Sequence, residues 1–193
     1  REFTLVAPSA VQPPPGMISW WPGDGDALDI ADGNPGTLIN GATFAIGKVD
    51  RAFSLDGYND YIEVTNAPNL NPANQITVEA WYKPTVSFRG NGSNPIVDKG
   101  YYSHIAPYYQ YHLSVVGDQY PNYPRSIGFL VAAGGTFYQA YTTSPSWTIG
   151  NWYHLVGSYD GSAVRLYVNG ALVSSTPASG TMADYGKNLR IGA

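Results

Sequence analysis

The sequence has no cysteine, which excludes disulfide bonds, cysteine nucleophiles and cysteine-based zinc sites within it. Charge is also sparse, since Asp, Glu, Lys and Arg together make up 12% of the residues and the ten basic residues occur singly. That pattern is not the footprint of a nucleic-acid or anionic-membrane binder. No apolar run approaches the roughly 18 residues of a membrane-spanning helix. We therefore expect partners other than nucleic acid and no membrane span.

What the sequence does have is typical of one larger all-β domain. Apolar residues make up 44% of the 193 residues, and 22 glycines and 15 prolines are spread along the chain as turn formers,. Sixteen tyrosines and five tryptophans are an unusually high aromatic content. Aromatic side chains favour strands and also form stacking platforms for sugar rings.

Short strands separated by turn signals recur along the whole sequence. Ile76–Tyr82 is the clearest run of alternating residues. Trp152–Tyr159 ends at Asp160-Gly161, and Ala163–Val168 ends at Asn169-Gly170, a dipeptide that suits a type I′ hairpin turn,. Met17–Trp21 is a candidate first strand, and Ala52–Leu55 with Tyr61–Val64 is a candidate hairpin. With about a dozen such strands and no amphipathic helix, the pattern predicts a two-sheet antiparallel sandwich.

The N-terminal residues 1–16 are predicted to lie outside this sandwich, which would span residues 17–193. A proline-rich linker, ending at Pro13-Pro14-Pro15-Gly16, follows a short β-prone run,. That run is a candidate assembly segment and consists of Phe3, Thr4, Leu5, Val6 and Ala7. An extended segment of this kind can pair with an open sheet edge of its own or a neighbouring molecule.

Four stretches, at residues 18–25, 53–62, 76–82 and 152–170, together resemble the laminin-G-like jelly-roll family of the concanavalin A-like lectin/glucanase fold. The resemblance covers most of residues 17–193 and implies an all-β jelly-roll sandwich. Family members serve as adhesion, sugar-binding and spacer modules beside unrelated catalytic domains. They usually continue with one more strand that carries an acidic pair, so we expect this sandwich to lack its closing C-terminal strand.

Catalytic residues are not expected. Glucanases of this fold use paired carboxylates on one strand, and the three glutamates here lie apart, at Glu2, Glu63 and Glu79. The histidines lie on separate segments, at His104, His112 and His154. Neither a Ser-His-Asp set nor a G-x-S-x-G motif is recognisable. His154 is expected to be a core or cross-strand residue, and Glu79 a structural one.

A loop near the start of the domain is a candidate calcium site. Its oxygen-bearing side chains are Asp24, Asp26, Asp29, Asp32 and Asn34. Calcium prefers several oxygen ligands from one loop, and the family resemblance implies a structural calcium near this position, with help from the acidic C-terminal strand. The alternative is that these residues are turn formers, which is also the expected role of Asp56 and Asp60.

A tyrosine-rich stretch is the candidate ligand-binding surface. Its members are Tyr101, Tyr102, Tyr109, Tyr111, Tyr120 and Tyr123. Strand alternation would place Tyr109 and Tyr111 on one face and Tyr108 on the other. Tyrosine offers a rigid apolar ring with a hydroxyl group, which suits a glycan or a protein partner; the alternative is that half of these rings pack the core.

The leading functional hypothesis is therefore a non-catalytic extracellular or cell-surface module that binds glycan or a protein partner. The alternative is a structural subunit that self-associates into a filament by strand exchange through residues 3–7. An enzyme is the third and weakest hypothesis.

Overall fold

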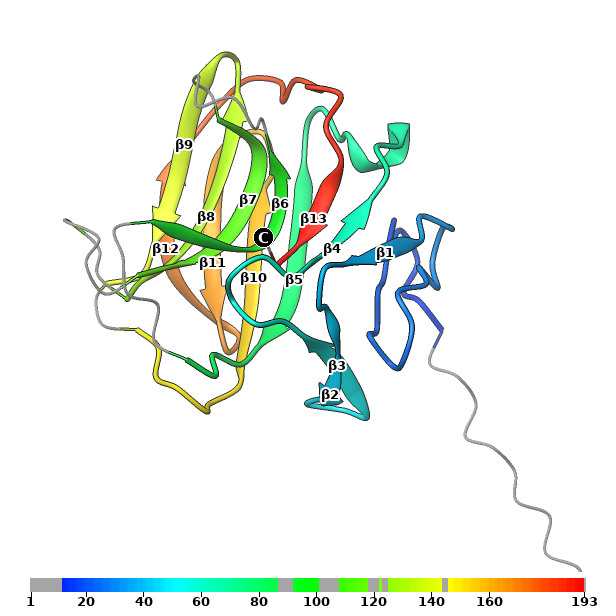
Figure 1. Ribbon diagram of the computed structural model, residues 1–193. Coiled ribbons are helices and arrows are strands. Elements are labelled where there is room, and N and C mark those ends of the chain that lie inside the picture. Colours follow the sequence, from blue (N-terminus) through cyan, green and yellow to red (C-terminus); the bar gives the residue numbers. More distant parts are fainter. Residues whose placement is uncertain are drawn as a thin grey trace, which may run out of the picture.

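The computed structural model describes residues 12–86, 92–100, 108–117, 122, 125–143 and 146–192. Within these residues the strands form three antiparallel sheets, and the only helical element is a short 3₁₀ turn, η1 (Pro68–Leu70). None of the described segments is a helix long and apolar enough to cross a membrane. The predicted all-β jelly-roll sandwich is confirmed (Figure 1).

The largest sheet of the described chain has seven strands. Their order is β1 (Gly36–Ile39), β4 (Tyr61–Val64), β13 (Leu189–Ile191), β6 (Ser93–Gly100), β7 (Tyr109–Val116), β8 (Ile127–Ala133) and β9 (Thr136–Tyr141). The C-terminal strand β13 thus lies inside this sheet, between two strands from the first half of the sequence.

A four-stranded sheet packs against the inner face of the seven-stranded sheet (Figure 1). Its order is β12 (Ala171–Pro177), β11 (Ala163–Val168), β10 (Tyr153–Tyr159) and β5 (Ile76–Tyr82). A separate hairpin of β2 (Thr43–Ile46) and β3 (Arg51–Ser54) projects from one end of the sandwich.

The core forms where the alternating apolar residues of the two sheets meet. From the seven-stranded sheet come Leu113 of β7 and Phe129 of β8, and from the four-stranded sheet Leu155 of β10 and Leu166 of β11; all four are fully buried. In β5, alternate residues are half-buried and exposed, which is the period-2 pattern of a strand with one face on the core,.

Two turns form as the sequence predicts. Asn169 and Gly170 both have positive φ, at 51° and 81°, and join β11 to β12. This is the backbone conformation that an Asn-Gly pair adopts at least cost. Asp160 closes the turn between β10 and β11, where its Oδ1 accepts hydrogen bonds from the backbone N–H groups of Ser162 and Ala163. Both turns are local, which explains why sequence alone identifies them.

Two predicted elements are wrong. Residues 17–21 form no strand, because their backbone bonds the following loop instead: Trp20 N–H donates to Asp29 Oδ1 (2.8 Å), and Ile30 N–H donates to the Trp20 carbonyl (2.9 Å). The strands at 51–54 and 61–64 do not form a hairpin, since β3 pairs with β2 and β4 with β1 and β13.

The turn between β3 and β4 is nevertheless held by Asp56 and Asp60, as expected. Asp56 Oδ1 accepts hydrogen bonds from the backbone N–H groups of Tyr58 and Asn59, and Asp60 Oδ2 accepts from the Asp56 N–H. The segment Phe3–Ala7 lies outside the described residues, so its role in assembly and the division at residue 16 stay predictions.

A stability prediction follows from the close packing of the two sheets at Gly157. A Cβ atom at this position of β10 would lie 2.1 Å from the Phe129 ring. Gly157→Ala should therefore destabilise the domain by about 1–3 kcal/mol, because overpacking forces Phe129 to move. Gly92→Ala is the matched control, since a Cβ atom added there would meet nothing within 4 Å and the φ of Gly92 is not positive. Equal urea midpoints for the two variants would contradict this packing.

Candidate binding face

One continuous row of residues crosses the outer face of the seven-stranded sheet. Each member is the registered partner of the next, and each strand contributes one. The members are Thr37, Glu63, Arg190, Asp98, His112, Leu130 and Gln139. Leu189 of β13 is buried in the core and Ile191 packs against it. Arg190, which lies between them, faces outward together with its registered neighbours. We call this set the cross-strand row.

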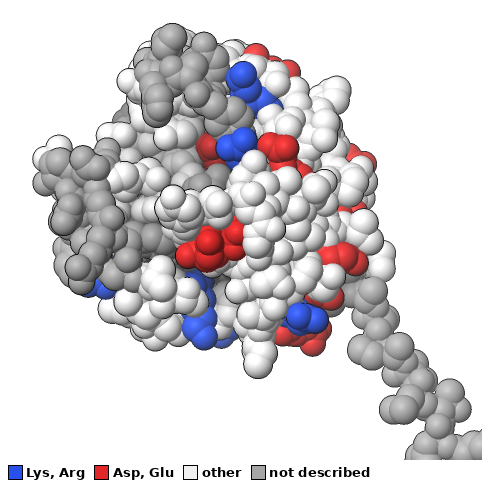
Figure 2. All heavy atoms as spheres, in the orientation of Figure 1, with Lys and Arg blue, Asp and Glu red and all other residues white. Residues whose placement is uncertain are grey.

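The part of the row on β4 and β13 is accessible and charged. Arg190 Nη2 lies 3.5 Å from Glu63 Oε1, and these two side chains are 27% and 31% exposed. The Arg190 guanidinium also lies over the Tyr61 ring, 4.5 Å from its centroid. Figure 2 shows basic and acidic side chains next to one another on this face. An ion pair above an aromatic ring is thus available to a ligand at this point.

The centre of the row is a buried chain of hydrogen bonds. His112 Nδ1 lies 3.1 Å from Asp98 Oδ1, and its Nε2 lies 2.9 Å from Ser93 Oγ. The Tyr109 ring stacks on the imidazole with a centroid distance of 4.1 Å and an interplanar angle of 18°. These contacts fix the position of the imidazole ring and satisfy both of its nitrogens.

Two further polar residues of β7 flank His112 in the sequence. Gln110 and Ser114 lie two residues before and two residues after His112, and both are buried. Gln110 Nε2 and Ser114 Oγ have no hydrogen-bond partner in the described part of the protein. Buried polar groups are normally paired, so these two buried atoms beside His112 are exceptions within the described part of the protein.

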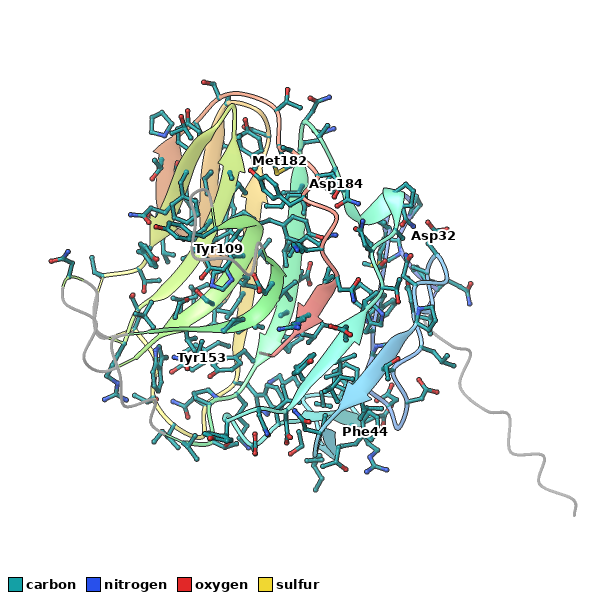
Figure 3. All side chains as sticks on the ribbon, turned by 45° about the horizontal axis from the view of Figure 1, so that its top comes forward. Asp32, Phe44, Tyr109, Tyr153, Met182 and Asp184 are labelled. Atoms are coloured by element: carbon teal, nitrogen blue, oxygen red, sulfur yellow. The ribbon has the colours of Figure 1, made fainter. Side chains whose placement is uncertain are left out.

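Aromatic residues gather at one end of β7. Tyr108 is 42% exposed, and its ring meets Phe137 of β9 edge-on at 6.4 Å. Tyr109 lies 6.2 Å from the same Phe137 ring and, as Figure 3 shows, sits on the seven-stranded sheet. This cluster offers apolar ring surface next to the polar row.

The tyrosines predicted to bind a ligand separate in the structure. Tyr109 lies on the outer face, but Tyr111 is in the core, 3% exposed, and its hydroxyl donates to the Leu70 carbonyl at 3.0 Å. Burial raises the pKa of Tyr111 far above its ordinary value. The two rings do not share a face because a register shift opposite Lys99 and Gly100 interrupts the alternation. The remaining candidates lie outside the described residues: Tyr101, Tyr102, Tyr120 and Tyr123.

In the acidic loop, Asp29 holds the backbone together. Its carboxylate accepts hydrogen bonds from the N–H groups of Trp20 (2.8 Å), Ala31 (2.9 Å) and Asn34 (3.1 Å). Burial alone would raise the pKa of this carboxyl, but the hydrogen bonds together outweigh burial and hold the pKa below its ordinary value of 3.8. The turn-forming role considered for this residue is therefore present.

The other members of the loop point to different partners. Asp24 accepts from Arg51 N–H and Asp26 from Leu28 N–H, both at 3.0 Å. Asp32 accepts from Asn69 Nδ2 at 2.7 Å and lies well apart from Tyr109 (Figure 3). Among the described residues, no group of three histidine, cysteine or acidic side chains is placed to hold a metal ion. Calcium at this loop stays a prediction.

Sequence reasoning missed the set Ser93, Asp98 and His112. It lies on neighbouring strands, but its members are brought together by the pairing of β6 with β7, whose register a sequence does not reveal. The available signal was a histidine and an aspartate in otherwise apolar, β-prone segments. His154 of β10 is a cross-strand residue as expected, with its Nε2 2.8 Å from Oε1 of Glu79 on the neighbouring strand β5 of the four-stranded sheet.

The family model of the concanavalin A-like lectin/glucanases superfamily, Laminin_G_3, matches residues 56–193. The chain therefore belongs to this superfamily, and the resemblance seen in the sequence is confirmed. No curated protein sequence matches the chain significantly.

Solved structures with a similar fold include domain 4 of AbnA, an extracellular GH43 arabinanase from Geobacillus stearothermophilus, in complex with arabinotriose. It has 21% sequence identity and a TM-score of 0.63, covering 86% of this chain and 77% of that one. The binding domain of botulinum neurotoxin DC has 10% identity and a TM-score of 0.50, covering 86% and 40%. Carbohydrate-binding module CBM66 from Bacillus subtilis has 15% identity and a TM-score of 0.45, covering 81% and 87%. At 21% identity, the similarity to the arabinanase domain shows a shared fold.

Asp29 generates a prediction about acid stability. Because its pKa is lowered in the folded state, its contribution to stability is present above the unfolded-state value of 3.8 and is lost as the pH falls through the lower folded-state value,. Asp29→Ala should lower stability at neutral pH by about 1–3 kcal/mol, since three N–H groups lose their acceptor. The difference from wild type should shrink below about pH 4.

Urea unfolding at neutral and acidic pH measures both effects. Asp26→Ala is the control, because Asp26 is exposed and accepts a single local hydrogen bond, from Leu28 N–H, at this turn. A difference between Asp29→Ala and wild type that stays constant with pH would contradict the assignment.

The calcium prediction has a separate test. A cation bound only by the folded state raises stability by mass action, so a chelator should lower the melting temperature and added calcium should restore it. Elemental analysis of the purified protein should find the metal. An unchanged melt in chelator, with no metal found, would leave the acidic residues as turn formers alone.

Proposed function

We propose that this chain is a non-catalytic extracellular module that binds glycan through the outer face of its seven-stranded sheet. The observation that carries the proposal is the cross-strand row, which places charged and polar side chains from neighbouring strands on one face. Sugars present hydroxyl groups that both donate and accept hydrogen bonds. A face that holds carboxylates, a guanidinium and amide and hydroxyl groups matches that chemistry.

The exposed aromatic ring beside the row strengthens the proposal. Tyr108 lies directly before β7, and its 42% exposed side chain supplies an apolar surface for a sugar ring,.

The fold agrees with this proposal. The arabinanase domain that shares it was solved with arabinotriose, which makes neutral plant-type glycans the first ligands to test. The superfamily description covers both lectins and glucanases, so the choice between binding and hydrolysis depends on the site residues.

Those residues favour binding over catalysis. Glu63 is paired with Arg190 and Asp98 with His112, so neither carboxylate has the unpaired position of a general acid and base pair,. Ser93, His112 and Asp98 have the connectivity of a serine-hydrolase triad. However, His112 is fully buried beneath Tyr109, which separates its ring from any leaving group.

The proposal predicts glycan binding that depends on this face. Wild-type protein should be retarded in native gels containing neutral polysaccharides and should leave them uncleaved. Tyr108→Ala should weaken binding at least about tenfold, because loss of an anchoring ring costs roughly 1.4 kcal/mol or more. Titration calorimetry with the best ligand gives the affinities.

Trp81→Ala is the matched control. Trp81 is also an exposed aromatic residue, 50% exposed, but lies on the outer face of the opposite sheet. Failure of wild type to bind any glycan would refute the proposed function. Weakening by Trp81→Ala alone would move the site to the other sheet.

A further inference from the structure

At the accessible end of the cross-strand row, one basic side chain lies beside an acidic one. Arg190 is its cation, and its registered partners on the two neighbouring strands are both acidic, Glu63 on β4 and Asp98 on β6. Glu63 forms the ion pair directly, with 3.5 Å between Nη2 and Oε1. Asp98 is buried and its carboxylate lies 3.1 Å from His112 Nδ1, so Glu63 is the partly exposed carboxylate beside the Arg190 guanidinium.

The position of the Arg190 guanidinium also limits its contact with a ligand. Its guanidinium is held over the Tyr61 ring at 4.5 Å, and an arginine fixed in this way has few directions left for a new partner. Recognition of a carboxylate or sulfate on a ligand needs an arginine whose donors are free to form a bidentate pair. At this position the protein's own glutamate already lies beside the guanidinium, with Oε1 3.5 Å from Nη2.

Lys99, the lysine of β6, does not add a positive charge to the outer face. Lys99 is buried on the opposite side of the sheet, where Nζ donates to Asn66 Oδ1 and to the Lys187 carbonyl. An anionic sugar placed on this part of the row would therefore meet the Glu63 carboxylate and an arginine that Glu63 already compensates, and like charges brought together at an interface are unfavourable.

We infer that the ligand of this face is a neutral glycan, and that Glu63 is the residue that excludes anionic ones. This inference rests on the proposed glycan-binding function and deepens it by naming the ligand class. Glu63 neutralises Arg190, so the pair carries no net positive charge that could attract a carboxylated sugar, while the Glu63 oxygens remain acceptors for neutral hydroxyl groups.

The test compares one glycan in two charge states. The neutral polysaccharide that wild type binds best is partly oxidised, so that a fraction of its primary hydroxyl groups become carboxylates. Wild type should bind the oxidised form at least about tenfold more weakly, a difference of roughly 1.4 kcal/mol. Glu63→Gln keeps the side-chain shape but removes the charge that neutralises Arg190. This variant should recover at least about half of the lost binding free energy for the oxidised form.

The recovered binding should disappear at high salt, because a partly exposed charge pair is screened. Glu79→Gln is the matched control. Glu79 is also an outward-facing glutamate paired with a basic side chain, His154, but on the opposite sheet; its substitution should leave the discrimination as in wild type. Thermal melts check that both variants are folded.

The outcomes separate the two proposals. Wild type that binds the oxidised glycan as well as the neutral one overturns the neutral-ligand inference and leaves glycan binding intact. Normal discrimination that Glu63→Gln does not relax overturns the role of Glu63. Absence of binding to either form refutes the proposed function itself, and the inference with it.

Discussion

The three residues of β13 hold the seven-stranded sheet together. Leu189–Ile191 pairs with β4 on one side and β6 on the other. Without it, the sheet would divide into the pair β1 and β4 and a four-stranded part made of β6, β7, β8 and β9. Such a short strand needs support from both ends. Asn188 Oδ1 accepts from the Asn66 N–H at 2.9 Å, and Gly192 N–H donates to the Ile96 carbonyl at 3.0 Å. Lys99 adds a bond to the Lys187 carbonyl, although burial lowers the pKa of this lysine to about 8.

This constraint makes the core and the candidate site interdependent. Leu189 is buried in the core and Ile191 packs on it, which forces Arg190 to the outer face between Glu63 and Asp98. A slip of one residue would turn Arg190 into the core and the two apolar side chains outward. The apolar pattern that selects the register of β13 therefore also sets the charge order of the outer face, so the chemistry of the candidate binding face follows from the packing.

The same dependence explains what the sequence could and could not predict. The hairpin at Asn169-Gly170 and the alternation of Ile76–Tyr82 are local properties, and both are found in the structure. Residues 18–25 carry part of the family resemblance. Met17–Trp21 nevertheless forms no strand, because the Trp20 N–H donates its hydrogen bond to the Asp29 carboxylate. The cross-strand row was beyond prediction, since its order depends on six pairings between strands, several of which lie far apart in the sequence. Tyr109 and Tyr111 were predicted to share a face, but a bulge in β7 itself, at Gln110 opposite Lys99 and Gly100, interrupts the alternation between them.

The two outer faces of the sandwich invert the usual relation between polarity and exposure. On the seven-stranded sheet, Gln110, His112 and Ser114 are polar and buried. On the four-stranded sheet, Trp81 and Leu172 are apolar and exposed. Replacing a poorly satisfied buried polar group by an apolar one is often neutral or stabilising, so stability alone gives no reason for Gln110 and Ser114 to be polar. A polar centre in a row that is charged at one end and bordered by aromatic rings at the other agrees with the proposed binding function. A face selected only for folding would have continued the apolar pattern that Leu130 begins on β8.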